Sequence, residues 1–140
     1  MFHSTKRKRI VLALLTALVL CFIWGNSCMS GETSGAVSDG LGAWLAKVIG
    51  EVSITVIRKL AHFSEFAALG FLLQWQRILW SRKSAAEAIL FGLLAAMADE
   101  TIQLFTPDRA SMVTDVWIDF GGVLAGTLLL LLLFSMRRKK

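Results

Sequence analysis

One face of a helical stretch carries the side chains best suited to acid–base or anion-binding chemistry. Arg58, His62 and Glu65 are spaced i, i+4 and i+7, so a helix places them on one face, with Lys59 one position round. A carboxylate with an assisting histidine can transfer protons, and neighbouring basic side chains can hold a phosphate or a carboxylate. The spacing therefore predicts a polar site on this helix.

A second polar set lies in the C-terminal half. It comprises two adjacent acids, a glutamine, an arginine and two further acids one turn apart, namely Asp99, Glu100, Gln103, Arg109, Asp115 and Asp119. We predict acid or base roles for Glu65, Asp99 and Glu100, assisted by His62. We predict binding roles for the others, namely Arg58, Lys59, Gln103, Arg109, Asp115 and Asp119.

Both sets lie in a chain whose composition predicts a membrane protein. Of its 140 residues, 56% are hydrophobic and 18% charged, and the mean hydropathy is +0.65. Residues 10–31 and 120–136 carry no charge, and a bilayer span needs about 20 apolar residues. We predict one all-α membrane domain over 1–140, with spans near 10–28, 60–80, 85–105 and 116–136. This composition excludes a soluble single-core protein, a disulfide scaffold and a nucleic-acid binder.

The basic residues predict the orientation of these spans. If the N-terminal tail 1–9 lies inside, then 11 of the 15 Lys and Arg residues also lie inside. Because Lys and Arg concentrate in cytoplasmic loops, both termini are predicted to be cytoplasmic. The first span also resembles a secretory signal, but it lacks a clear small-x-small cleavage site, so we favour an uncleaved anchor.

The one long connection, residues 29–57, is then predicted to lie outside. Its first part is rich in Gly, Ser and Thr and is expected to be a loop. Apolar residues at helical spacing over 41–49 predict an amphipathic helix in the outer interface. Because Val52, Ile54 and Val56 alternate, a short strand after Gly50 is an open alternative.

The ionisable residues of three predicted spans lie at matching depths in the outer half of the membrane. Glu65 is six residues beyond Lys59, about 9 Å along a helix. Asp99 lies at a similar distance from Phe105, and Asp119 is four residues into its span. We therefore expect an outer pocket between the second, third and fourth spans.

The acids and cations of this predicted pocket do not balance in number. A lone carboxylate at mid-membrane costs about 2.5–3.5 kcal/mol on insertion scales, so the acids must pair, take up protons or reach water. They outnumber the fixed cations Arg58, Lys59 and Arg109. We therefore expect at least one carboxyl to be protonated or to contact an outside ligand.

Two glycines predict a close helix contact below the acids of the last span. Gly122 and Gly126 share a face with Asp115 and Asp119. Small residues four apart let another helix approach closely. The partner is either a helix of the same chain or a second copy in a homo-oligomer.

Metal and cofactor binding are not predicted. Several of the acids, with His62, could form an oxygen-rich set for Mg²⁺ or Ca²⁺. The neighbouring arginines and lysine would compete as counter-charges, and there is neither an HExxH motif nor a Cys–His zinc spacing. There is also no Gly-rich phosphate loop and no G-x-S-x-G motif.

Two segments resemble a known family. Residues 58–66, RKLAHFSEF, resemble the Lys-x-x-His-Phe-x-Glu-aromatic segment of VanZ-like membrane proteins. Residues 99–109, DETIQLFTPDR, followed by Asp115, Gly122 and Gly126, resemble that family's second signature. The resemblance spans about half of the chain. The family usually has Asn where this chain has Asp119.

The resemblance implies a setting, the bacterial cytoplasmic membrane, and no reaction. The founding member of the family is associated with low-level resistance to the glycopeptide teicoplanin. The main hypothesis is therefore a cell-envelope protein whose outer pocket binds or modifies a lipid-linked or cell-wall molecule, with an anionic lipid as another partner besides the bilayer. Two alternatives are a proton-coupled transporter or small channel, and a purely structural network of buried charges.

Overall fold

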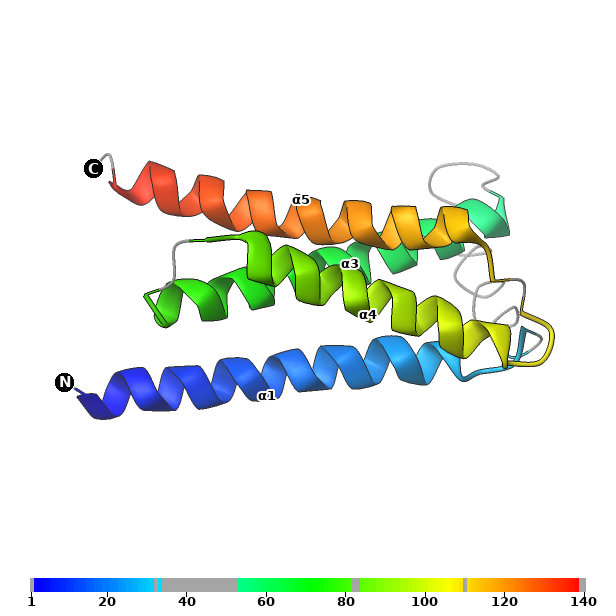
Figure 1. Ribbon diagram of the computed structural model, residues 1–140, viewed down its shortest axis with the longest axis horizontal. Helices are drawn as coiled ribbons and strands as arrows, with labels where there is room; N and C mark the ends of the chain where they lie inside the picture. The colour runs from blue at the N-terminus through cyan, green and yellow to red at the C-terminus, as the bar shows by residue number, and fades with distance from the viewer. Residues whose placement is uncertain (1, 32, 34–52, 82–83, 110, 139–140) are drawn as a thin grey trace, which may run out of the picture.

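The computed structural model describes residues 2–31, 33, 53–81, 84–109 and 111–138. Within these residues the protein is all-helical and contains no strand, which confirms the predicted fold class (Figure 1). The helices are α1 (Phe2–Ser27), α3 (Ile54–Leu79), α4 (Ala86–Leu104) and α5 (Val113–Arg138). The predicted interfacial helix at 41–49 lies outside the described residues.

One alternative for the start of α3 needs correction. The alternative of a strand is wrong at Ile54 and Val56, because both belong to α3. The helix begins six residues before the predicted span, so it carries Arg58 and Lys59 on its first turns, while the bounds of the span itself stay a prediction. This extension fixes both cations on the same rigid element as His62.

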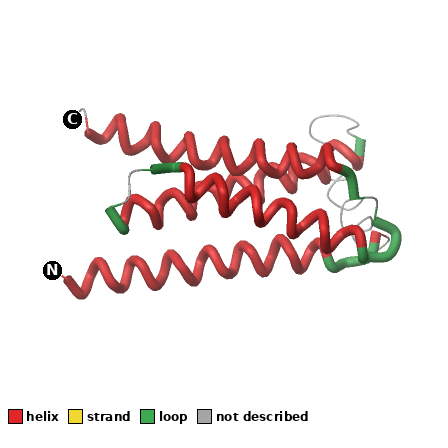
Figure 2. The backbone as a smooth tube through the Cα atoms, viewed as in Figure 1, coloured by secondary structure: helices red, strands yellow, loops and turns green. Residues whose placement is uncertain are grey.

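The helices form an antiparallel bundle in which α3 and α4 lie between α1 and α5 (Figures 1 and 2). The most extensive contact is that between α3 and α5. Both chain ends lie at one end of the bundle, here called the terminal end. The other end, called the distal end, holds the end of α1, the start of α3, the end of α4 and the start of α5.

The glycines of α5 explain its close contact with α3. A Cβ added at Gly122 would collide with the backbone of Phe63, and one at Gly126 with the backbone of Ala67. From the opposite side, a Cβ at Gly70 would collide with Val123. The small-residue face therefore packs within the chain, and self-association through the same glycines stays a prediction.

The bundle hides polar groups and exposes apolar ones, the reverse of a soluble protein. Its apolar core is small and consists of Ile23, Phe66, Leu69, Ala95, Ala96 and Val123. Buried polar residues occur on every helix and include Thr16, Gln74, Asp99 and Thr127. Large apolar side chains meanwhile face outward along each helix. An extended apolar exterior is typical of a protein surrounded by lipid.

Two helices are long and apolar enough to cross a bilayer. They are Thr5–Ser27 within α1 and Val113–Arg137 within α5. The helices α3 and α4 carry more charge, so their crossing of the membrane stays a prediction, as does the cytoplasmic placement of the termini.

The loop between α4 and α5 closes the distal end over α1. Thr106 donates a hydrogen bond to the carbonyl oxygen of Ser27 at 2.9 Å, and Arg109 donates to those of Asn26 and Met29 at 2.8 and 3.2 Å. These bonds satisfy carbonyls that the last turn of a helix leaves without partners. They lock α1 beside the acids of α4.

Candidate functional site

A cavity of about 240 Å³ lies at the distal end, between α3, α4 and α5. Its walls combine two cations, a histidine and several acids with a few apolar side chains. The lining residues include Arg58, Lys59, His62, Glu100, Gln103, Met112, Asp115 and Asp119. This volume is enough for a small headgroup or a few waters, so the cavity can admit a polar ligand.

The two cations of the cavity differ in how they are held. Lys59 Nζ lies 2.8 Å from Asp115 Oδ1, an ion pair that joins α3 to α5. Arg58 is half-buried and makes no ion pair or side-chain hydrogen bond with any other described residue. Its guanidinium is therefore available to an anion that enters the cavity.

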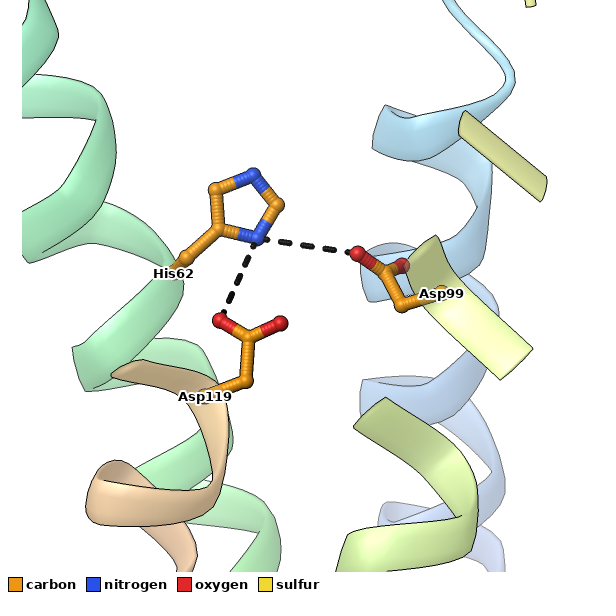
Figure 3. Close-up of side chains that lie close together, drawn as sticks. All are labelled: His62, Asp99 and Asp119. Carbon is orange, nitrogen blue, oxygen red and sulfur yellow. Dashed lines mark ion pairs between the residues drawn. The ribbon is translucent and has the colours of Figure 1, made fainter. Parts of the chain in front are cut away.

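At the inner wall, His62 meets two acids from two other helices (Figure 3). Its Nδ1 lies 3.7 Å from Asp99 Oδ2 on α4 and 3.8 Å from Asp119 Oδ1 on α5. Both acids are almost fully buried, with exposed fractions of 0% and 1%. Among the described residues, these three have ligand atoms within 4.8 Å of one another, a separation that could hold a metal ion.

The carboxylate of Asp99 is fixed by hydrogen bonds. Ser27 Oγ on α1 donates to Oδ1 at 2.6 Å, and Gln103 Nε2 donates to Oδ2 at 2.8 Å. The same Gln103 nitrogen lies 3.2 Å from Ser27 Oγ. Sequence reasoning missed Ser27, because a polar residue at the end of an apolar run is ordinary and gives little sign of a role.

Glu65 faces α1 rather than the cavity. Its Oε1 accepts a hydrogen bond of 3.4 Å from Asn26 Nδ2, and its Oε2 is buried with no hydrogen-bond partner among the described residues. Asn26 is the second polar residue of α1 that sequence reasoning missed. Glu65 therefore lies behind the cavity wall, between α3 and α1.

Glu100, by contrast, lines the cavity and is held by the segment before α5. Ser111 Oγ donates to its Oε2 and, at 3.0 Å, to its backbone oxygen. The backbone nitrogen of Met112 donates to the same carboxylate oxygen at 3.2 Å. These contacts orient Glu100 toward the cavity, where it can exchange a proton with a bound molecule.

Arg109, for which a binding role was predicted, lies beside the end of α1. It does not line the cavity, and its bonds go to backbone carbonyls of α1. Burial and then the nearby charge of Arg58 lower the pKa of its guanidinium, while Nη1 is buried without a hydrogen-bond partner among the described residues. Its visible role is to hold α1 against the loop.

A family model described as VanZ/LLP1 matches residues 9–134, nearly the whole chain. The chain belongs to the VanZ/LLP1 family. No curated protein and no solved structure matches it. The family match, together with the two membrane-suited helices, indicates a membrane protein.

The two segments that resemble VanZ-like signatures face each other across the cavity. From the first segment, Arg58, Lys59 and His62 lie on the α3 wall, and from the second, Glu100, Gln103 and Asp108 lie on the opposite walls together with the start of α5. Seven of the predicted site residues line it, namely Arg58, Lys59, His62, Glu100, Gln103, Asp115 and Asp119. Three do not, namely Glu65, Asp99 and Arg109.

Proposed function

We propose that this VanZ/LLP1 protein binds a lipid-linked or cell-wall molecule of the bacterial envelope in its distal cavity. The observation that carries the proposal is the cavity itself, which joins Arg58, a cation with no ion pair among the described residues, to a wall with the buried acids Glu100 and Asp119. Arg58 and Lys59 hold a phosphate or carboxylate of the ligand near the cavity entrance. Polar groups of the same ligand then reach His62 and Glu100.

The geometry supports binding more directly than catalysis. Glu100 and His62 line the cavity and can donate or accept protons there, whereas Glu65 and Asp99 lie behind the wall. A carboxylate behind the wall can position the side chains that line the cavity and change their electrostatic surroundings, but it does not contact the ligand. We therefore assign direct ligand contact to Glu100 and His62 and a positioning role to Asp99.

The proposed side of the membrane is the outside. Lys and Arg residues gather at the terminal end, in the N-terminal tail and after the last span. The positive-inside rule then places the terminal end in the cytoplasm and the cavity at the outer surface, where envelope precursors are displayed. The lipid-facing exterior of the bundle would let a lipid-linked ligand approach from within the bilayer.

The test uses a bacterial strain whose teicoplanin sensitivity and envelope-lipid profile change when the full chain is expressed. Arg58→Gln and Glu100→Gln should each reduce that change at least tenfold at equal membrane abundance, because each removes a charge from the cavity. Arg137→Gln, an exposed residue at the terminal end, is the matched control and should keep the full change. If both cavity variants act like the unmodified protein, the proposal is wrong.

A further inference from the structure

We propose that His62, Asp99 and Asp119 form a binding site for one divalent cation of the zinc class, at the inner wall of the cavity. The three side chains come from α3, α4 and α5 and converge on one point (Figure 3). This inference goes beyond the proposed function, because an ion can bind whether or not an envelope molecule does.

The distances between His62 and the two carboxylates suit a shared metal ion better than direct hydrogen bonds. His62 Nδ1 is 3.7 and 3.8 Å from the two carboxylate oxygens, too long for hydrogen bonds. Zinc bound about 2.0–2.2 Å from each nitrogen or oxygen ligand places cis ligands roughly 3–4 Å apart. The observed triangle therefore needs only small side-chain shifts to close around an ion.

Asp119 supplies an independent sign that this point binds a ligand. The residue is 1% exposed, and its Oδ2 has no hydrogen-bond partner among the described residues. His62 Nδ1, which faces the same point, also has none. Buried polar atoms are nearly always partnered, so two unpartnered atoms aimed at one place call for an unseen partner.

The surroundings of Asp99 resemble the outer shell of a metal site. Ser27 and Gln103 each donate a hydrogen bond to a different oxygen of this carboxylate. Metal-ligating carboxylates are themselves commonly hydrogen-bonded, and such partners fix their orientation. Asp99 is therefore held ready for coordination from the side of His62.

The ligand set and charge select the class of ion. An imidazole with two carboxylates suits zinc and similar transition metals, whereas Mg²⁺ and Ca²⁺ prefer oxygen ligands alone. Two carboxylates also balance a charge of +2. Because His62 and Asp119 line the cavity, the fourth position of a three-ligand site would open into it.

Two of the three cations that were expected to compete are held by other groups, while the third, Arg58, lines the cavity but forms no ion pair with the acids of this site. Lys59 pairs with Asp115, and Arg109 bonds to backbone carbonyls of α1. Among the described residues, no lysine or arginine forms an ion pair with Asp99 or Asp119. The expectation that counter-charges fill this site, made from sequence, is therefore replaced by a metal proposal.

The test measures zinc in the full, tag-free chain, purified in detergent with His3→Gln to remove the second histidine. After equilibration with ZnCl₂ and removal of free ion, mass spectrometry should find one zinc per chain. His62→Gln and Asp119→Asn should each weaken zinc binding at least tenfold, since losing even an outer-shell partner costs on the order of 10–100-fold.

Asp108→Asn is the matched control for Asp119→Asn. Asp108 also lines the cavity but lies outside the three-residue site, and its backbone φ of 57° is one that Asn tolerates. This variant should bind zinc like the unmodified chain. No zinc in the unmodified chain, or equal binding in all variants, would overturn the proposal.

A measurement on the unmodified chain guards against variants that fail to fold. Co²⁺ added to the protein should give the visible absorption of a low-coordinate nitrogen–oxygen site, and zinc should displace it at one equivalent. A cobalt spectrum like that of the hydrated ion would count against the site. Because no envelope molecule is present, this result is separate from the outcome of the teicoplanin experiment.

Discussion

The two ends of the bundle both carry buried polar residues, but among the described residues only the distal end carries a group of buried acids, namely Asp99, Glu100 and Asp119. At the terminal end, Arg77 forms an ion pair with Glu87, and Gln76 donates a hydrogen bond of 2.5 Å to Thr16. At the distal end, the described residues form one lysine–carboxylate pair, Lys59–Asp115, among several acids. The half-buried arginine of the terminal end is therefore paired with an acid, whereas the buried acids of the distal end require protons, an ion or a ligand.

The apolar core separates these two regions along the helix axes. Ile23, Phe66, Leu69 and Val123 lie between the level of His62 and that of Gln74. A proton-coupled transporter needs polar groups or water between its two openings. Among the described residues, this core contains no Asp, Glu, Lys, Arg or His side chain, and the transport alternative stays a prediction.

The close contact between α3 and α5 should give the largest effect, because it positions the walls of the distal site. In Gly126→Val, the new side chain would meet the backbone of Ala67, and the helices would have to separate. We expect a loss of about 3 kcal/mol or more of stability, the upper range for overpacking. Thermal unfolding of the detergent-solubilised protein, followed by circular dichroism, measures it.

Gly25→Ala is the control for this substitution. A Cβ at Gly25 meets nothing within 4 Å, so the variant should unfold within a few degrees of the unmodified protein. If Gly126→Val also unfolds within a few degrees of the unmodified protein, the stability of the bundle does not depend on the close contact between α3 and α5.

The next comparison removes one buried hydroxyl from each end. Ser27→Ala takes a donor from the carboxylate of Asp99, whereas Thr16→Val takes a hydroxyl that bonds to Leu12 and Gln76. Hydrogen bonds to charged groups contribute about 1.5–3 kcal/mol and neutral ones about 0.5–1.5 kcal/mol. Ser27→Ala should therefore destabilise the protein more, as measured in the same unfolding assay. Equal losses would mean that Asp99 is uncharged.

Sequence reasoning reached the helices and most of the cavity, because periodicity and charge are local properties. The spacing of Arg58, His62 and Glu65 defines a face of one helix from the sequence alone. The structure shows that this face is divided, with His62 turned to the cavity and Glu65 to α1. Which side of α3 faces which neighbouring helix depends on the packing of the whole bundle, and the sequence of α3 alone does not determine it.

The contribution of α1 was the main omission at the distal end. Asn26 and Ser27 end an apolar run, a place where polar residues are ordinary, so their type gave little sign of a role. Their partners, Glu65 and Asp99, lie 39 and 72 residues away. Sequence reasoning also missed Gln74 and Thr127, two polar residues that are buried toward the terminal end.

Ion pairs at the two ends should give the smallest effect. Lys59–Asp115 joins side chains that are 34% and 24% exposed, and Arg77–Glu87 joins side chains that are 15% and 42% exposed. Exposed pairs typically contribute about 0.2–1 kcal/mol and weaken as salt rises. Double-mutant cycles with Lys59→Met and Asp115→Asn, and with Arg77→Met and Glu87→Gln, should therefore give coupling energies in this range at both ends.

Similar coupling at the two ends would mean that ion pairs do not distinguish them. The difference would then lie in the acids that no lysine or arginine neutralises, above all Asp99 and Asp119. A coupling energy above about 2 kcal/mol for Lys59–Asp115 would contradict this view, because it exceeds the range of exposed pairs. In that case the pair would itself act as a buried structural element, and a ligand phosphate would have to compete with Asp115 for Lys59.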